Sequence, residues 1–253
     1  MNYKQFEDNI FAEWRKRSVA NGDGCELASD GLLYRGRFVY KDGYWSREPG
    51  NENAIWERAK RRVLILTKDL NDEEAWDIRA ETGRNNFSGE NNVVVSAPFY
   101  KNLMRWVYGL LTIDANGHAK KFAEIDRQDV YQPFYDQAPV ARVNCKKQVG
   151  TSSIETSVLK SYMERYKDLL VKQISAYDAN ILLCCGASGA IKDFVAENYL
   201  TDLLKLNNWV YYSPRTHKMV IDSWHPTYTG DTHEKMYSDM MSGVEEAWSR
   251  IKL

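Results

Sequence analysis

Short apolar runs alternate with amphipathic segments along most of the chain. The runs are brief and partly β-branched, which is typical of strands buried on both faces of a parallel sheet. The principal predicted strands cover residues 63–66, 141–144, 181–185 and 219–221, and residues 209–212 are expected to pair with the last of them. Strands that alternate with helices indicate a sheet covered on both faces. The pattern therefore predicts a three-layer α/β/α fold around a central, mostly parallel, four-stranded sheet.

Segments with apolar residues three or four positions apart predict the helices. Pro98 stands at one expected helix start, a position that favours proline. The predicted helices cover residues 3–19, 53–60, 72–80, 98–111, 154–174 and 233–251, with a further helix after Gly189. Residues 32–44 predict a small hairpin or irregular strands. No linker, repeat or low-complexity tract occurs, so the sequence predicts a single domain over 1–253, in which residues 1–60 extend a core at 61–253.

The charges along the chain nearly cancel. The 253 residues carry 34 basic and 35 acidic side chains, for a net charge of −1. Such a protein has no overall positive field, so any phosphate-binding surface must be local. None of the four cysteines forms a C-x-x-C pair, and the adjacent Cys184 and Cys185 should face opposite sides of a strand. The sequence shows neither a signal peptide nor an apolar stretch of membrane-spanning length, so we expect a cytoplasmic protein.

Polar side chains follow three of the predicted strands at the point where each ends. Asp69 follows the first, Asn144 ends the second, and His225 follows the last. Ligands of open α/β sheets bind outside the carboxyl ends of the strands, so these residues predict one shared site. Each also has a structural alternative. Asp69 could cap a helix, Asn144 could satisfy backbone at a strand end, and His225 could be a structural hydrogen-bonding residue.

Other chemistries have weaker support in the sequence. Gly186-Ala-Ser-Gly189 could bind phosphate at a helix start, but it lacks the G-x-G-x-x-G spacing, so a tight strand-to-helix turn is the preferred interpretation. No G-x-S-x-G occurs, and Cys145 and Cys185 lack an activating context. We expect no metal or other cofactor, because the remaining candidate ligands fit no compact motif; they are His217, Asp222, His225 and His233.

Five segments, in order and at similar separations, resemble motifs of the uracil-DNA glycosylase superfamily. The family's carboxylate loop, often Gln-Asp-Pro-Tyr-His, is matched by Lys-Asp69-Leu-Asn-Asp, and its Pro-x-x-x-Asn helix start by Pro98-Phe-Tyr-Lys-Asn. Its next two strands are matched by Val-Asn144 and by Leu182-Leu-Cys-Cys-Gly-Ala, and its His-Pro-Ser loop by His225-Pro-Thr. The resemblance spans about residues 62–250 and implies a uracil-DNA glycosylase-like fold.

The resemblance implies a role for each matched residue in breaking a base–sugar bond. Asp69 would stabilise the cationic sugar or orient the attacking water, and a neutral His225 would donate to the departing base anion. Asn144 would donate to one base carbonyl and accept from the adjacent ring N–H. Phe87 would stack on an extruded base, and Asn71 would line the base pocket where the family has tyrosine. The implied reaction is metal-free hydrolysis of an N-glycosidic bond in DNA.

Several residues near the same strand ends are expected to contact nucleic acid. The alternative for the charged ones is ordinary solvated surface charge. The set consists of Lys68, Lys146, Lys147, Arg215 and Thr227, together with Tyr228 as the candidate wedge after His-Pro-Thr.

The chain departs from the family pattern in ways that leave its function open. Leu70 and Asn71 replace the Pro and Tyr of the best-known motif, which leaves the base selectivity undetermined, and Thr227 replaces the usual Ser. The loop after His225 has no obvious leucine wedge, and the cysteine spacing of the iron–sulfur branch is missing. Two alternatives to a DNA glycosylase follow. One is a non-catalytic module that binds nucleic acid or nucleotides, and the other is a hydrolase that processes free nucleosides. The sequence indicates no particular protein partner.

Overall fold

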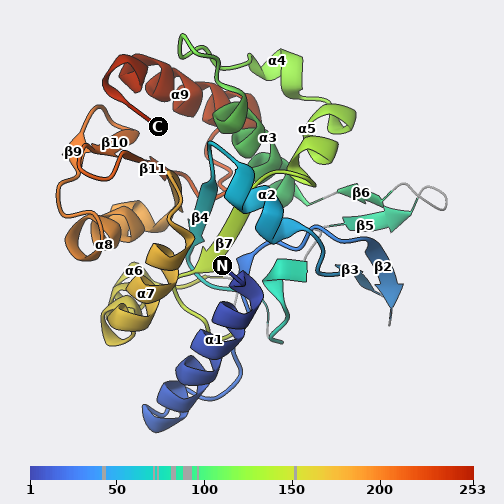
Figure 1. The fold of residues 1–253 in the computed structure, drawn as a ribbon, viewed down its shortest axis with the longest axis vertical. Coiled ribbons are helices and arrows are strands. Elements are labelled where there is room, and N and C mark those ends of the chain that lie inside the picture. Colours follow the sequence, from blue (N-terminus) through green and yellow to red (C-terminus); the bar gives the residue numbers. More distant parts are fainter. Residues whose placement is uncertain are drawn as a thin grey trace.

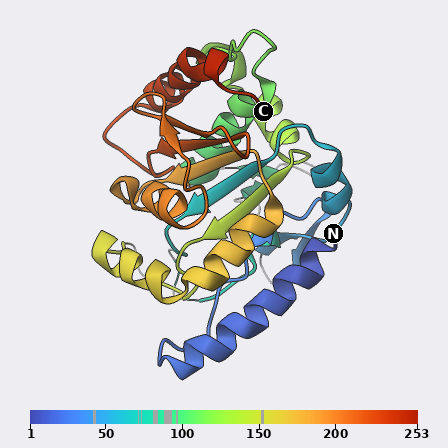
Figure 2. The same cartoon turned by 60° about the vertical axis from the view of Figure 1, so that its left-hand side comes forward.

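The computed structural model describes residues 1–41, 44–70, 72, 74–80, 84–87, 93–95, 97–150 and 153–253, and only the backbone of residues 41, 44, 84–87 and 93–95. A seven-stranded sheet lies between two layers of helices (Figures 1 and 2). Its strands are β1 (Gly31–Leu32), β4 (Val63–Thr67), β7 (Val140–Asn144), β8 (Ile181–Cys185), β9 (Leu204–Lys205), β10 (Val210–Ser213) and β11 (Lys218–Ser223). Two antiparallel ribbons pair β2 (Phe38–Lys41) with β3 (Tyr44–Arg47), and β5 (Arg84–Phe87) with β6 (Val93–Val95).

The centre of the sheet is parallel, and its edges are antiparallel. The strand order is β1-β7-β4-β8-β11-β10-β9, in which the four middle strands β7, β4, β8 and β11 run in one direction. The predicted α/β class and mostly parallel sheet are therefore confirmed, whereas the predicted count of four strands is wrong. β1, β10 and β9 extend the sheet to seven through antiparallel pairings. β1 and β9 have two residues each, too few to produce a periodic signal in the sequence.

Helices cover both faces of the sheet and create two apolar cores. One face carries α1 (Tyr3–Ala20), α2 (Glu52–Arg58), α6 (Thr156–Arg165), α7 (Lys167–Tyr177) and α8 (Ala190–Asn198). The other carries α3 (Pro98–Thr112), α4 (Phe122–Ile125), α5 (Gln128–Tyr135) and α9 (His233–Ala247). Short 3-10 turns occupy Ile78–Ala80, Ala187–Gly189 and Trp248–Arg250. Cys184 belongs to the first core and Cys185 to the second, which confirms that they face opposite sides.

The helix predicted over residues 154–174 is in fact two helices, α6 and α7, which are separated at Tyr166. The ring of Tyr166 packs on that of Trp14, with centroids 5.7 Å apart, and its hydroxyl donates to Asp23 at 2.5 Å. These contacts with α1 and the turn after it hold Tyr166 in a non-helical conformation. The apolar periodicity continues through the break, so the sequence pattern does not reveal it.

The helix predicted over residues 72–80 is wrong. Among the described residues of this segment, only the last three are helical, as a single 3-10 turn. The backbone pairs with the N-terminal region instead, since the Ile78 N–H donates to the Ser29 carbonyl at 2.7 Å. Arg79 forms a buried ion pair with Glu7 of α1, at 3.0 Å. Tertiary partners therefore override the local helix pattern.

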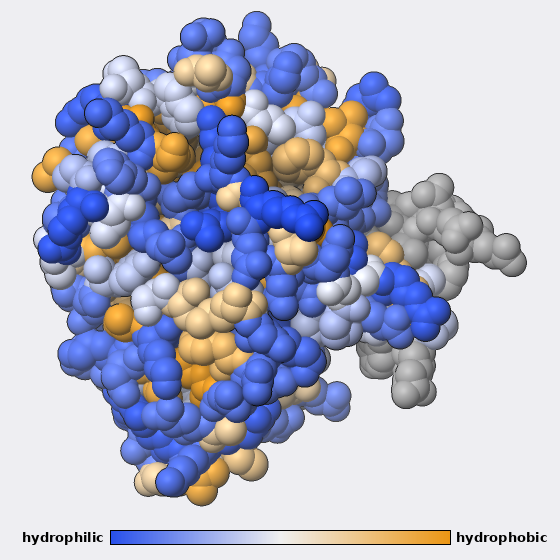
Figure 3. Space-filling model, in the orientation of Figure 1, coloured by the Kyte–Doolittle hydropathy of each residue, from blue (hydrophilic) through white to orange (hydrophobic). Residues whose placement is uncertain are grey.

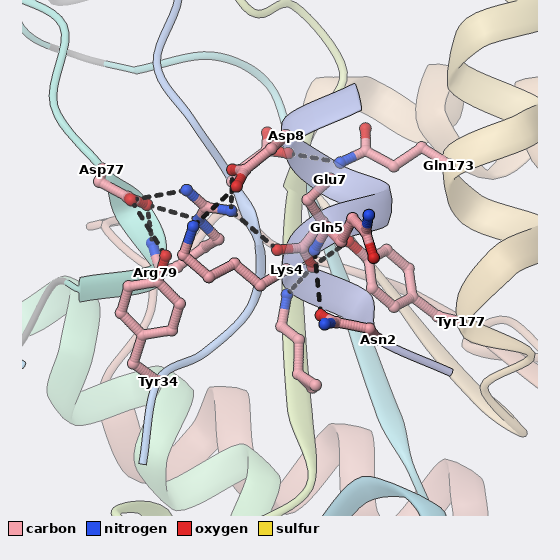
Figure 4. Close-up of polar contacts among 12 residues, drawn as sticks. Asn2, Lys4, Gln5, Glu7, Asp8, Tyr34, Asp77, Arg79, Gln173 and Tyr177 are labelled. Carbon is pink, nitrogen blue, oxygen red and sulfur yellow. Dashed lines mark hydrogen bonds and ion pairs between the residues drawn. The ribbon is translucent and has the colours of Figure 1, made fainter. Parts of the chain in front are cut away.

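Residues 1–60 are tied to the sheet by a buried polar cluster (Figure 4). Glu7 is 1% exposed and accepts hydrogen bonds from the Leu32 N–H at 2.7 Å and from the Tyr177 hydroxyl at 2.8 Å. Figure 4 shows the Arg79 guanidinium between Glu7 and Asp77. Burial raises the pKa of Glu7 to about 7, although the Leu32 N–H and Arg79 oppose this effect. Because these partners come from β1, α7 and the 77–79 turn, the N-terminal region forms part of the core.

Hydrophilic side chains cover most of the face drawn in Figure 3, and apolar residues occur there in scattered patches. With 34 basic and 35 acidic residues in the chain, neither sign of charge predominates. Within the described ranges, no helix combines the length and the apolar character that crossing a bilayer requires.

Candidate functional site

The strand order creates a topological switch point between β4 and β8. These two strands are neighbours, but the chain continues from β4 to β7 on one side and from β8 to β11 on the other. In open α/β sheets, ligands bind in the crevice outside the carboxyl ends of the strands at such a point. Asp69 lies two residues after β4, and Gly186 directly follows β8. The topology thus indicates the same edge of the sheet as the sequence motifs do.

The strand register brings the three predicted residues to this one edge. Asn144 is the last residue of β7 and pairs with Thr67, the last residue of β4. Ser223 at the end of β11 pairs with Cys185 at the end of β8, and His225 follows two residues later. The carboxyl ends of three of the four parallel strands therefore deliver a carboxylate, an amide and an imidazole to the same side of the sheet.

Asp69 is held in a largely buried position beside a lysine. Its side chain is 7% exposed, and its Oδ2 lies 3.7 Å from the Lys146 Nζ. Gly150 backs the carboxylate so closely that an added Cβ would lie 2.5 Å from Oδ2. Burial raises the pKa of Asp69, and the charges of Lys146 and Lys68 oppose that rise. A carboxylate in such a low-dielectric setting can stabilise a nearby cation strongly or orient a water molecule.

His225 is half-buried and neutral near pH 7. Burial, together with the charges of Lys68 and Arg142, lowers its pKa to about 4. The Thr227 N–H donates to Nδ1 at 3.3 Å, and the Thr227 hydroxyl lies 2.7 Å from the same atom. Because Nδ1 accepts, the ring proton resides on Nε2. The imidazole can therefore offer one N–H donor to a ligand oxygen that gains negative charge.

Lys68 connects the two ends of the site electrostatically. Its charge affects the pKa of Asp69 and also that of His225. The Lys68 carbonyl accepts from the Lys146 N–H at 2.8 Å, which continues the pairing of β4 and β7 beyond the strands. Asp69 and His225 therefore share one electrostatic environment.

The His-Pro-Thr loop packs against the start of α3. The Asn102 side-chain amide donates to the Pro226 carbonyl at 2.7 Å, and the Phe99 ring lies 5.7 Å from the His225 ring. The Arg142 guanidinium of β7 lies over the same Phe99 ring, with its Cζ 4.6 Å from the ring centroid. Two segments that the family resemblance singled out separately are thus in direct contact.

Gly186 gives His225 the room it occupies. An added Cβ at Gly186 would lie 3.0 Å from the His225 Cβ, and the residue has φ +79°. Gly186→Ala should therefore destabilise the fold by about 1–3 kcal/mol, because a backbone at φ +79° and ψ −155° is accessible essentially only to glycine, and should displace His225 as well. We expect a lower melting temperature and a lower rate of base excision, the reaction that the family resemblance implies.

Gly22→Ala is the matched control for this prediction. Gly22 has φ +75°, but no atom lies within 4 Å of its added Cβ. It should lower the melting temperature in differential scanning calorimetry through the backbone alone and keep the wild-type rate of base excision. Equal activities of the two variants would show that Gly186 does not position His225.

Asn144 is fully buried, and its backbone N–H, side-chain oxygen and side-chain nitrogen differ in their hydrogen-bond partners. Its backbone N–H donates to Asp30 at 2.8 Å, and its side-chain Oδ1 accepts from the Thr67 hydroxyl at 2.5 Å. Its Nδ2 has no hydrogen-bond partner within the described part of the protein. The amide therefore retains a donor that a ligand at this edge could satisfy.

Lys147 lies in the core, so its predicted contact with nucleic acid is wrong. The side chains of Lys147 and Asp30 are both 0% exposed, and the two form an ion pair at 2.6 Å. The ammonium also lies over the rings of Trp14 and Phe11, at 4.9 and 5.5 Å from their centroids. Burial lowers the pKa of Lys147, and Asp30 opposes that effect. The neighbouring Lys146 points the other way, toward Asp69.

Removing this buried charge should strongly destabilise the protein. Lys147→Ala leaves the Asp30 carboxylate in the core without its cation, and breaking such a pair costs about 3–5 kcal/mol. Chemical denaturation in urea measures the loss. Lys160→Ala, on the exposed side of α6, should change stability by less than about 0.5 kcal/mol. A loss of that small size at Lys147 would contradict the importance of the pair.

The other predicted contact residues are placed differently. Lys68 and Lys146 are half-buried near Asp69, and Lys146 also donates to the carbonyls of Gln148 and Val149. Thr227 is exposed, but its N–H and hydroxyl serve His225.

Two further predicted contact residues flank the site or lie away from it. Tyr228 is 43% exposed and nearly parallel to the Trp224 ring, at 6.4 Å. Arg215 precedes β11, at the opposite edge of the sheet from His225, and its backbone N–H donates to Asp202. Asn71 and the side chain of Phe87 fall outside the described residues, so their predicted roles stay predictions.

Sequence reasoning missed the layer behind the site, namely Asp30, Thr67 and Arg142. Arg142 could have been found from the sequence, because a charged residue within a strand buried on both faces indicates a polar partner beside it. Asp30 had none, since its partners come from distant parts of the chain. The thiols of Cys145 and Cys185 are poor nucleophiles, as burial raises the pKa of each to about 12. Among the described residues, no group of His, Cys, Asp and Glu is arranged to hold a metal.

No protein-family model matches this chain, and no curated protein matches it either. Any functional conclusion therefore depends on the residues and their geometry.

Proposed function

We propose that this protein hydrolyses the N-glycosidic bond of a damaged or deaminated base in DNA, as its resemblance to the uracil-DNA glycosylase superfamily implies. One observation carries the proposal. A buried carboxylate, Asp69, and a neutral imidazole, His225, occur at the carboxyl edge of one parallel sheet, beside its switch point.

The chemistry of the reaction matches these two groups. As the bond breaks, the sugar becomes cationic and the leaving base becomes anionic. The Asp69 carboxylate would stabilise the sugar cation and orient the attacking water. The Nε2–H of His225 would donate to the base oxygen that gains charge, and a donor of this kind is effective in a water-excluded site.

The positive groups around His225 support an anionic leaving group. Lys68 and Arg142 both lower the pKa of His225, so both lie close enough to act on a charge placed beside it. The same cations that keep the imidazole neutral would stabilise the base anion. This arrangement would allow departure of the base without its prior protonation.

A glycosylase panel tests the proposal. Oligonucleotides with a single uracil, hypoxanthine, or oxidised or alkylated base are incubated with the protein, and abasic sites are then cleaved with alkali. We expect cleavage on at least one deaminated base. The proposal would be falsified if no oligonucleotide in the panel were cleaved by a folded protein.

A second candidate is a non-catalytic module that binds nucleic acid or nucleotides through the same site. The ion pair between Asp69 and Lys146 favours it, because a carboxylate that is already paired and has a raised pKa is a weaker catalyst. Binding without turnover distinguishes this candidate. Its affinity should fall steeply with salt if phosphates are contacted.

A further inference from the structure

A hollow of about 710 Å³ opens beside the carboxylate of the candidate site. Its wall is formed by α6 and by the segment that follows β7, and it includes Lys146, Gln148, Val149 and Ser157. The volume is in the range of small-molecule sites. Lys146 belongs both to this wall and to the pair with Asp69, because its Nζ lies 3.7 Å from the Asp69 Oδ2. The hollow and the carboxylate therefore share one amine.

The hydrogen bonds of Lys146 suit a neutral amine. Its Nζ donates to the carbonyls of Gln148 and Val149, both at 3.0 Å. The distance of 3.7 Å to the Asp69 Oδ2 is longer than a hydrogen bond. An ammonium has three N–H donors, whereas a neutral amine has two and one lone pair. The two carbonyls can therefore accept both N–H groups of the neutral form, and its lone pair is left to react.

The electrostatics of the pair favour the same form. Burial lowers the pKa of Lys146, although Asp69 opposes this effect, and burial raises the pKa of Asp69. Both shifts favour transfer of the ammonium proton to the carboxylate. The Lys146 side chain is 16% exposed, so it can meet a ligand, whereas that of Lys147 is 0% exposed. A desolvated lysine of this kind is an activated nucleophile toward carbonyl carbons.

We propose a second activity for this site, in which the Lys146 amine attacks the aldehyde of an abasic deoxyribose in DNA and the strand is then cleaved. The inference rests on the proposed function for its substrate, because base excision leaves a sugar whose C1′ is an aldehyde in the ring-opened form. Asp69 is proposed to act at the same C1′ during excision. Its neighbour at 3.7 Å is therefore close to the carbon where the aldehyde forms.

The reaction uses these two side chains, the substrate and water. Asp69 takes a proton from the Lys146 ammonium, and the amine nitrogen adds to C1′. The C1′ oxygen takes one proton from the nitrogen and one from Asp69 and leaves as water, which gives a protonated imine. The Asp69 carboxylate then removes a proton from C2′, a double bond forms between C2′ and C3′, and the C3′–O bond breaks with the phosphate as leaving group. Water hydrolyses the imine, which regenerates Lys146, and the proton on Asp69 passes to water.

Reductive trapping on a preformed abasic site tests the proposal. An oligonucleotide that carries one natural abasic site is incubated with the protein and sodium borohydride, which reduces the imine to a stable amine. We expect a covalent protein–DNA complex, and peptide mass spectrometry should place the sugar on Lys146. Without borohydride, we expect strand cleavage in the absence of alkali. A tetrahydrofuran analogue of the abasic site has no aldehyde and should give neither product.

Lys146→Arg should abolish both products, because a guanidinium stays protonated and is a poor nucleophile. Lys160→Arg, on the exposed side of α6, is the matched control and should keep both. Trapping by a folded Lys146→Arg protein would overturn the proposal. Attachment of the sugar to another amine of the wild type would do the same, and that measurement needs no variant.

Preformed abasic DNA also separates this proposal from the proposed function. If the wild-type protein excises no base but is trapped through Lys146, the proposed function fails and the second activity stands. If it excises a base and gives no covalent complex, it is a glycosylase alone and the second activity is overturned. The absence of both products overturns both.

Discussion

Replacing Asp69 with Asn should lower the rate of base excision by about 10²–10⁴-fold and leave the protein folded. The amide is neutral, so it can no longer stabilise the sugar cation, and it activates water poorly. Burial raises the pKa of Asp69, which means that the ionised form is disfavoured in the fold. The substitution should therefore not lower the free energy of unfolding at neutral pH. Single-turnover excision and thermal unfolding measure the two effects.

Asp222→Asn is the control for this substitution. Asp222 is the penultimate residue of β11, and burial raises its pKa as well, but it lies near Lys192 and Gly189 on the α8 side of the sheet. We expect wild-type excision by this variant. An Asp69→Asn protein that keeps the wild-type rate would remove Asp69 from the mechanism. Equal losses in both variants would point to damage at the sheet edge.

Replacing His225 with Ala should lower the excision rate by about 10²–10³-fold, as expected for the loss of one donor to a developing anion. The wild-type rate should show no titration of His225 between about pH 5 and 8, because a pKa of about 4 keeps the ring neutral there. A pH–rate profile measures this, and an inflection near 6.5 that disappears in the variant would contradict a neutral donor. His217→Ala, which removes a histidine bonded to Tyr212 before β11, should keep the wild-type rate.

The same pKa predicts how stability depends on pH. The folded-state value of about 4 lies below the ordinary 6.5, so the unfolded chain binds the proton first as the pH falls. His225 therefore contributes stability above pH 6.5 that is lost on acidification toward pH 4, by at most about 3 kcal/mol. Urea denaturation of the wild type and of His225→Ala across this range separates the contribution of His225 from that of Glu7, which titrates near pH 7 in both proteins. If the free energies of unfolding of the two proteins changed in parallel with pH, His225 would make no such contribution.

The part of the site that lies at strand ends could be predicted from the sequence. Apolar runs reveal buried strands, and parallel strands align their carboxyl ends, so Asp69, Asn144 and His225 are expected at one edge before any coordinates exist. The same logic fails for the edge strands. β1 and β9 have two residues each, and their pairing depends on neighbours that the local sequence does not specify.

The groups behind the site could not be predicted, because burial of a charge depends on its partner. Lys146 and Lys147 are adjacent and identical in type, yet one lines the site and the other lies in the core beside Asp30. Nothing in the local pattern distinguishes them. Arg142 is the exception, since a guanidinium within a run of buried residues indicates a polar layer there.

The polar cluster around Glu7 has a consequence for how the molecule is made. Glu7 and its partner Tyr177 are 170 positions apart, and Asp30 and its partner Gln173 are 143 apart. Long-range contacts of this kind close late and slowly. During synthesis, α1 can therefore form these contacts only after the residues of α7 have left the ribosome. Its apolar face is open to chaperones or to aggregation throughout that interval.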